Sequence, residues 1–225
     1  MGCIIALGLF AGAQAAMSWA TTNILVDATL VVFAVAAAMM KVRVPGITGT
    51  YSLSFVGVLI AIPALSPSEL VSIAAISALV QCLWHARTRP TPTEIIFNIS
   101  AVILSAAIAQ TVYSAAMTHG RGSREVAVIA MSAALYWVVN TGVISVLLAL
   151  LREGGLREVW QQWCLWSLPL YLAGASVAGL LSSYVRAGDW IAPLLFLPLL
   201  LLAGLYYRIW AERYGQAAAA VCSTR

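Results

Sequence analysis

The stretch Thr93–Met117 reads TEIIFNISAVILSAAIAQTVYSAAM, and its one charged residue, Glu94, stands at its start. It is 25 residues long, and about 17–25 predominantly apolar residues are enough to cross a bilayer as a helix. A second long run without charge follows at Val126–Leu151. Because the strands of a membrane barrel alternate polar and apolar residues, these continuous apolar runs favour membrane-spanning helices.

Composition extends this conclusion to the whole chain of 225 residues. Hydrophobic residues make up 62% and charged residues 9% of the sequence, and the mean hydropathy is +0.95. An ordinary soluble domain carries about 25% charged residues. The composition therefore excludes a soluble globular protein, a disordered chain and a disulfide-stapled secreted domain. It predicts an all-α integral membrane protein, a polytopic bundle embedded in the lipid bilayer.

We expect about eight transmembrane helices joined by short loops. The third and fourth apolar runs are short, and Pro63 lies within the third, so these two could form a helical hairpin that does not fully cross. Ala13-Gln14-Ala15 resembles a signal-peptidase site, and cleavage there would leave seven spans. The eight runs are Cys3–Trp19, Ile24–Met40, Tyr51–Leu65, Glu69–Trp84, Thr93–Met117, Val126–Leu151, Trp163–Tyr184 and Trp190–Tyr207.

Basic residues in alternate loops predict how these spans are oriented. Nine Lys and Arg residues fall on one side and three on the other, and the side richer in Lys and Arg faces the cytoplasm. We therefore expect both termini in the cytoplasm, with residues 1–214 as a single transmembrane domain and residues 215–225 as a short cytoplasmic tail. The nine are Lys41, Arg43, Arg87, Arg89, Arg152, Arg157, Arg208, Arg213 and Arg225, and the three are Arg121, Arg124 and Arg186.

Neither the formal net charge of +4 nor the cysteines indicate a nucleic acid or a metal. The basic residues occur in ones and twos between apolar runs, so we expect no nucleic-acid partner. The cysteines and histidines lack the spacing of a zinc site, and we expect no metal and no cofactor. The sequence also lacks GxSxG, HExxH and P-loop motifs. The residues concerned are Cys3, Cys82, Cys164, Cys222, His85 and His119.

Polar side chains inside the predicted spans are the candidate ligand-binding residues, because placing them in lipid is costly. Asp27, Gln14 and Gln110 fall in the outer third of their spans, and Asp27 is the one acidic residue well inside a span. In an outward-facing pocket Asp27 would bind a cation, a proton or an amine. Alternatively, Asp27 stays hydrated near the interface or caps its helix. Asn140 lies near the middle of the sixth span, where it either bonds across helices or binds a ligand.

Three pairs of small residues spaced four apart predict close helix packing. Residues at this spacing share one helix face and let two backbones approach. Such faces would pack helices within the chain or join two copies as a homodimer. The pairs are Gly8 and Gly12, Gly174 and Ala178, and Ala175 and Gly179.

Several short segments follow one another in an order that is similar to a known family. In this succession, over about residues 24–214, the sequence resembles the membrane-embedded sensory modules of the MASE type that precede diguanylate cyclase and HD-GYP phosphodiesterase domains in bacteria. The segments are Val44-Pro45-Gly46 with Tyr51-Ser52-Leu53-Ser54, Phe97-Asn98, Tyr136 with Asn140-Thr141, Pro169-x-Tyr171-Leu172-x-Gly174, and Pro198 with Tyr207-Arg208.

The resemblance implies a multi-pass input module of the bacterial inner membrane, without catalytic activity of its own. It would bind a small molecule and act on a cytoplasmic signalling partner. The sequence ends at Arg225 without a cyclase, phosphodiesterase or kinase domain, so we expect either a stand-alone relative or a sensor cut from a longer protein.

Two alternatives remain open. The first is a small-solute transporter, or the substrate-capture subunit of an energy-coupling-factor-like transporter with an ATPase partner. The second is an integral membrane enzyme. An enzyme commonly groups two or more ionisable side chains at one depth, so a second acid or a histidine beside Asp27 would favour it.

Overall fold

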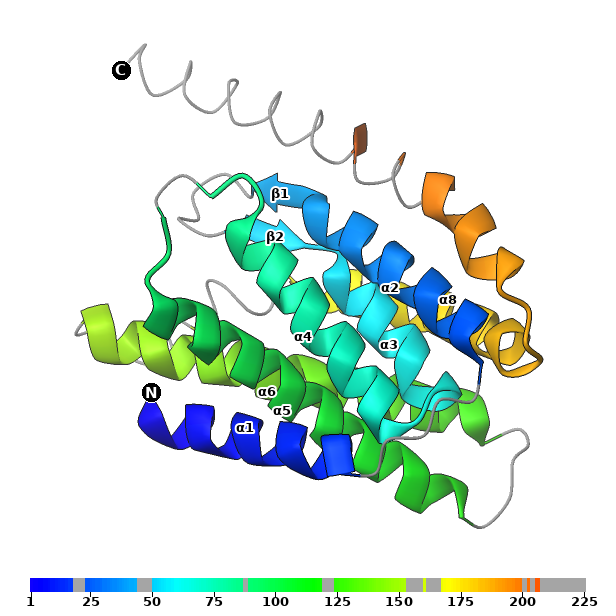
Figure 1. The fold of residues 1–225 in the computed structure, drawn as a ribbon, viewed down its shortest axis with the longest axis horizontal. Helices are drawn as coiled ribbons and strands as arrows, with labels where there is room; N and C mark the ends of the chain where they lie inside the picture. Colours follow the sequence, from blue (N-terminus) through cyan, green and yellow to red (C-terminus); the bar gives the residue numbers. More distant parts are fainter. Residues whose placement is uncertain are drawn as a thin grey trace.

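The computed structural model describes residues 1–17, 23–43, 50–86, 89–118, 124–152, 160, 167–199, 202 and 205–206. These residues form a bundle of helices with a short strand pair at one end (Figure 1). The helical fold predicted from the apolar runs is confirmed. The elements are α1 (Gly2–Met17), α2 (Ile24–Met39), β1 (Lys41–Arg43), β2 (Thr50–Ser52), α3 (Ser54–Ala64), α4 (Pro67–Leu83), α5 (Pro92–Met117), α6 (Glu125–Arg152), α8 (Leu168–Arg186) and a helix over residues 191–199.

The central helix of the bundle is α3. Its positions from Ser54 to Pro63 are all buried, and it packs against α2, α4, α5 and α8. A helix enclosed in this way has no solvated face, which explains why the segment is almost uniformly apolar. At about 1.5 Å per residue α3 is roughly 16 Å long, which is about half of a ~30 Å hydrocarbon layer. It forms a helical hairpin with α4, and Leu65 and Ser66 form the turn between the two helices.

The segment expected to begin the third span forms a strand instead. β1 and β2 pair in antiparallel register, with Val42 opposite Tyr51. α2 ends at Met39, and Met40 has left the helical conformation (φ −81°, ψ 80°). The prediction of a helix from Tyr51 was wrong, because cross-strand hydrogen bonds satisfy the backbone of this segment in place of helical ones.

Two capping boxes start α4 and α5. The hydroxyls of Ser66 and Thr91 accept hydrogen bonds from the N–H groups of Glu69 and Glu94, at 3.5 and 3.3 Å. The two glutamates return the bond by accepting from the N–H groups of Ser66 and Thr91, at 2.8 and 2.9 Å. A proline follows each capping residue, where its missing N–H costs no helical bond. The local sequence therefore sets both helix starts.

Small residues let neighbouring helices touch. A Cβ added at Gly8 in α1 would lie 2.5 Å from the Cβ of Ser100 in α5, and one added at Gly174 in α8 would lie 2.5 Å from Cε2 of Phe55 in α3. No side chain fits at such distances, so both glycines serve packing within the chain. Gly179 differs, because a Cβ there would meet nothing within 4 Å.

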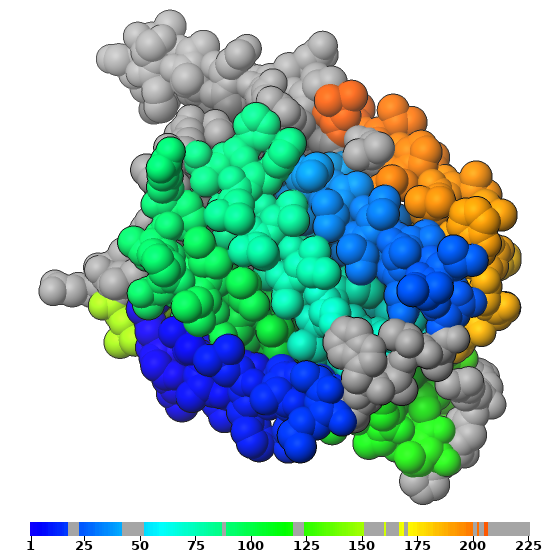
Figure 2. Space-filling view, viewed as in Figure 1, coloured from blue at the N-terminus to red at the C-terminus, as the bar shows by residue number. Residues whose placement is uncertain are grey.

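The outer helices expose large apolar side chains. α1 lies along one side of the bundle surface (Figure 2), where Phe10 is 61% exposed, and Val126 and Leu150 of α6 are 75% and 74% exposed. Apolar surface of this kind suits contact with lipid. Among the described helices, α5 and α6 are long and apolar enough to cross a membrane, whereas α1 to α4 are apolar but shorter.

Candidate functional site

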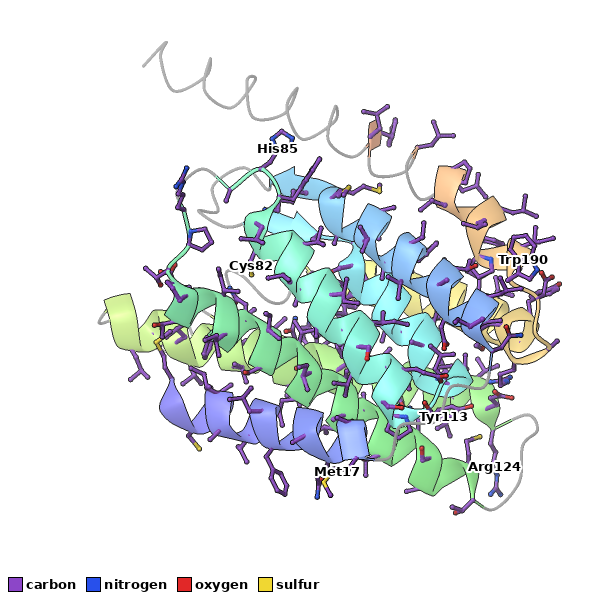
Figure 3. The ribbon with its side chains drawn as sticks, viewed as in Figure 1. Met17, Cys82, His85, Tyr113, Arg124 and Trp190 are labelled. Atoms are coloured by element: carbon purple, nitrogen blue, oxygen red, sulfur yellow. The ribbon has the colours of Figure 1, made fainter. Side chains whose placement is uncertain are left out.

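Polar side chains from five helices meet around the turn between α3 and α4. We call this set the polar cluster. Tyr113 lies toward this end of the bundle, whereas Cys82 and His85 lie toward the opposite end (Figure 3). The polar cluster consists of Asp27 from α2, Glu69 from α4, Gln110 and Tyr113 from α5, Glu125 from α6 and Arg186 from α8.

Gln110 connects α5 to the end of α3. Its side chain is 6% exposed, and its Nε2 donates a hydrogen bond of 3.0 Å to the backbone carbonyl of Leu65. Leu65 is the C-terminal capping residue of α3 and has extended geometry. The last carbonyls of a helix lack partners within it, so Gln110 supplies a donor that α3 itself cannot provide.

An ion pair connects α6 to α8. Nη1 of Arg186 lies 2.6 Å from Oε1 of Glu125, and the two side chains are 20% and 19% exposed. The hydroxyl of Tyr113 donates to the same Oε1 at 3.1 Å. Nη1 of Arg186 also donates to the Tyr113 hydroxyl at 3.4 Å and to the Pro63 carbonyl at 3.5 Å. One guanidinium group therefore links α3, α5, α6 and α8, and its charge is neutralised by Glu125.

A pair of carboxyl groups connects α2 to α4. The side chains of Asp27 and Glu69 lie within hydrogen-bonding reach of each other. Glu69 is 4% exposed, and its Oε2 accepts from both the N–H and the hydroxyl of Ser66 at 2.8 Å. Oδ1 of Asp27 is buried and has no hydrogen-bond partner. In the sequence Glu69 is only the first residue of the apolar run Glu69–Trp84. Its contact with Asp27 was not predicted, because it depends on α2 packing beside α4.

Asp27 does not cap α2, contrary to one of the two structural roles considered for it. The N-cap is Asn23, whose Oδ1 accepts from the N–H groups of Leu25 and Val26 at 3.1 and 3.4 Å. Asp27 stands in the first turn of the helix, where a negative charge complements the helix dipole. Its carboxyl group is therefore available for the contact with Glu69.

The other two candidate residues lie apart from the polar cluster. Gln14 is exposed on α1, and within the described residues no hydrogen bond joins it to Asp27 or Gln110. Asn140 donates from Nδ2 to the hydroxyl of Tyr171 at 3.2 Å, a bond between α6 and α8. The Tyr171 ring stacks on Phe55 of α3 at a centroid distance of 4.1 Å. Asn140 thus bonds across helices, one of the two roles considered for it.

Several residues that carry the family resemblance lie at the end of the bundle with the strand pair β1–β2, which we call the hairpin. Ser52 accepts from the N–H of Ser54 at 3.1 Å, and the Ser54 hydroxyl donates to Gln81 at 3.1 Å. Asn98 donates to the Cys82 sulfur at 3.6 Å. These contacts join the start of α3 and the start of α5 to the end of α4. Pro169 stands in the first turn of α8, and Pro45 and Gly46 lie outside the described residues.

Lys41 ties the hairpin to the bundle. Its Nζ donates a hydrogen bond to the backbone carbonyl of Trp84, the C-terminal capping residue of α4. Burial lowers the pKa of Lys41 from its usual value, and the neighbouring Cys82 thiolate would partly oppose this effect. In the described part of the chain, no group of three or more His, Cys, Asp and Glu side chains forms a set of metal ligands.

These features define a class of protein: a helical module with an apolar exterior, a polar cluster at one end and a small hairpin at the other. The MASE9 family model matches residues 15–207, so the chain belongs to the MASE9 family of membrane-associated sensor domains. The resemblance to MASE-type sensory modules is therefore confirmed. No curated protein and no solved structure matches the chain.

Proposed function

We propose that this chain is a multi-pass sensory module of a bacterial inner membrane, with about eight spans and both termini in the cytoplasm. Membership of the MASE9 family is the observation that carries the proposal. The sorting of nine basic residues to one side and three to the other supports the orientation. In this orientation the polar cluster faces outward and the hairpin faces the cytoplasm.

The polar cluster is the proposed input site for a small ligand. A ligand that alters the turn between α3 and α4 acts on contacts of five helices at once. Asp27 lies in the first turn of α2, which leads to the hairpin, and Glu69 lies in the first turn of α4, which is capped at its end by Trp84. A displacement between these two helices at the polar cluster is therefore carried to the Lys41–Trp84 contact at the other end. There it would reach a cytoplasmic signalling partner.

A transport assay distinguishes a sensory module from the first alternative, a small-solute transporter. The full chain is reconstituted in sealed lipid vesicles that contain a pH-sensitive dye, and a pH step is applied outside. If the protein is a sensor, the pH gradient should decay at the same rate in these vesicles as in vesicles without protein. Faster collapse of the gradient, or counterflow of any solute that the protein binds, would contradict a sensory role.

The carboxyl pair of Asp27 and Glu69 is the observation in favour of the enzyme alternative, since two adjacent acids can act as general acid and base. A catalytic pair must reach its substrate, however, and Glu69 is 4% exposed. Its Oε2 is also engaged by Ser66. Both facts, together with the family of sensor domains, favour binding over catalysis.

A further inference from the structure

We propose that Asp27 and Glu69 hold one proton between them, and that this proton is the ligand to which the module responds. The second part of this inference rests on the proposed sensory function. The contact with Glu69 was not expected from the sequence. Because of it, Asp27 is one of a pair of acids that bridges α2 and α4.

The geometry of the pair requires a proton. Two ionised carboxylates offer acceptors alone and repel each other, so a hydrogen bond between them needs one protonated partner. Oε2 of Glu69 accepts two hydrogen bonds from Ser66, which stabilise negative charge on that side. Oδ1 of Asp27 is buried and has no such donor. A neutral Asp27 that donates to Glu69 therefore leaves one negative charge on the pair, on the side that Ser66 stabilises.

The surroundings contribute few other charges. The elements packed most extensively against α2 are α3, α4 and β2, and α4 also packs against α1 and α5. Arg186, at the same end of the bundle, is paired with Glu125. The titratable side chains on these packed elements, apart from the pair itself, are Tyr51 of β2, Cys82 of α4, Cys3 of α1, and Glu94 and Tyr113 of α5.

Loss of the proton changes the force between α2 and α4. The proton leaves to water, the charge of the pair goes from minus one to minus two, and the hydrogen bond is replaced by repulsion. The two helices are joined again at their far ends by Lys41 and the Trp84 carbonyl. Separation at Asp27 and Glu69 therefore strains or shifts that second contact, which lies beside the hairpin.

Infrared spectroscopy of the full chain in lipid vesicles tests the inference directly. We expect the carbonyl-stretch band of a protonated carboxylic acid in neutral buffer, with loss of that band in alkaline buffer. Asp27→Asn and Glu69→Gln should each abolish the band in neutral buffer, because a lone carboxyl group loses its shared proton. Asp189→Asn is the matched control and should keep it. This acid caps the helix over residues 191–199 through the N–H groups of Ile191 and Ala192.

Two results would overturn the inference: a native chain without a titrating carboxylic-acid band, or a band that persists unchanged in either variant. Asn at position 27 still donates a hydrogen bond to Glu69, so this variant retains the bridge between the helices, and a thermal melt checks that it folds. Failure of the proton site leaves the sensory function standing. Faster decay of the pH gradient in the vesicle assay would instead contradict the sensory function, but it would not contradict the shared proton.

Discussion

The ammonium group of Lys41 donates a hydrogen bond to the backbone carbonyl of Trp84, 43 residues further along the chain. This contact joins the strand that follows α2 to the residue that ends α4. Asp27 and Glu69 join the starts of the same two helices. α2 and α4 are thus linked at both ends, by the carboxyl pair at one end and beside the hairpin at the other.

Replacing Lys41 should loosen the hairpin without unfolding the bundle. β1 and β2 share three residue pairs, and so short a ladder is marginally stable by itself. We expect Lys41→Met to speed amide hydrogen exchange in β1 and β2, with the exchange of α5 and α6 unchanged. Arg89→Met, at an exposed position, is the control. Equal exchange in Lys41→Met and the native chain would mean that the hydrogen bond does not hold the hairpin.

The lowered pKa of Lys41 also predicts a pH dependence of stability. In the window between its folded pKa and the usual value of 10.5, the unfolded chain binds more protons than the folded chain. The free energy of unfolding therefore gains a positive contribution from Lys41 as the pH rises through that window, and loses it as the pH falls. Chemical denaturation at several alkaline pH values should give a smaller upward slope for Lys41→Met. An identical slope would refute the prediction.

Breaking the ion pair of the polar cluster should destabilise the fold. Arg186→Gln leaves the Glu125 carboxylate without its cation and removes a donor to Pro63 and Tyr113. We expect a loss of about 1–3 kcal/mol in the free energy of unfolding, since both groups are partly buried. Arg124→Gln, at an exposed position, should stay within about 0.5 kcal/mol of the native chain. Thermal melts in detergent measure both, and equal melting temperatures would argue against the role of Arg186.

Two glycines of α8 give a matched pair for helix packing. Gly174→Ala places a Cβ 2.5 Å from the Phe55 ring, and such overpacking costs about 1–3 kcal/mol. Gly179→Ala meets nothing within 4 Å, and an alanine in a helix is favoured over glycine by roughly 0.5–1 kcal/mol. We expect opposite shifts of melting temperature. A stabilising effect at Gly174 would show that α8 does not pack on Phe55 as described.

The sequence predicted helix positions well where a capping box or a long apolar run marks them. α4 begins at Pro67, two residues before the expected start at Glu69, and α5 ends at Met117 as expected. The strand pair was missed because three residues per strand are too few for an alternating pattern. The contacts of Glu69 with Asp27 and of Glu125 with Arg186 were missed for another reason. Each contact joins segments that are distant in the sequence, and the hydrophobic periodicity of a helix does not predict which helices lie beside it.

In the proposed orientation the polar cluster faces the outside of the membrane and the hairpin end faces the cytoplasm. Thiol labelling tests it most directly, with single cysteines at Ser123 or Thr88 in a chain whose four native cysteines have been replaced. In intact spheroplasts, an impermeant thiol reagent should label Ser123→Cys. It should label Thr88→Cys only after the membrane has been permeabilised. Labelling of Thr88→Cys from outside, with Ser123→Cys protected until permeabilisation, would contradict the account.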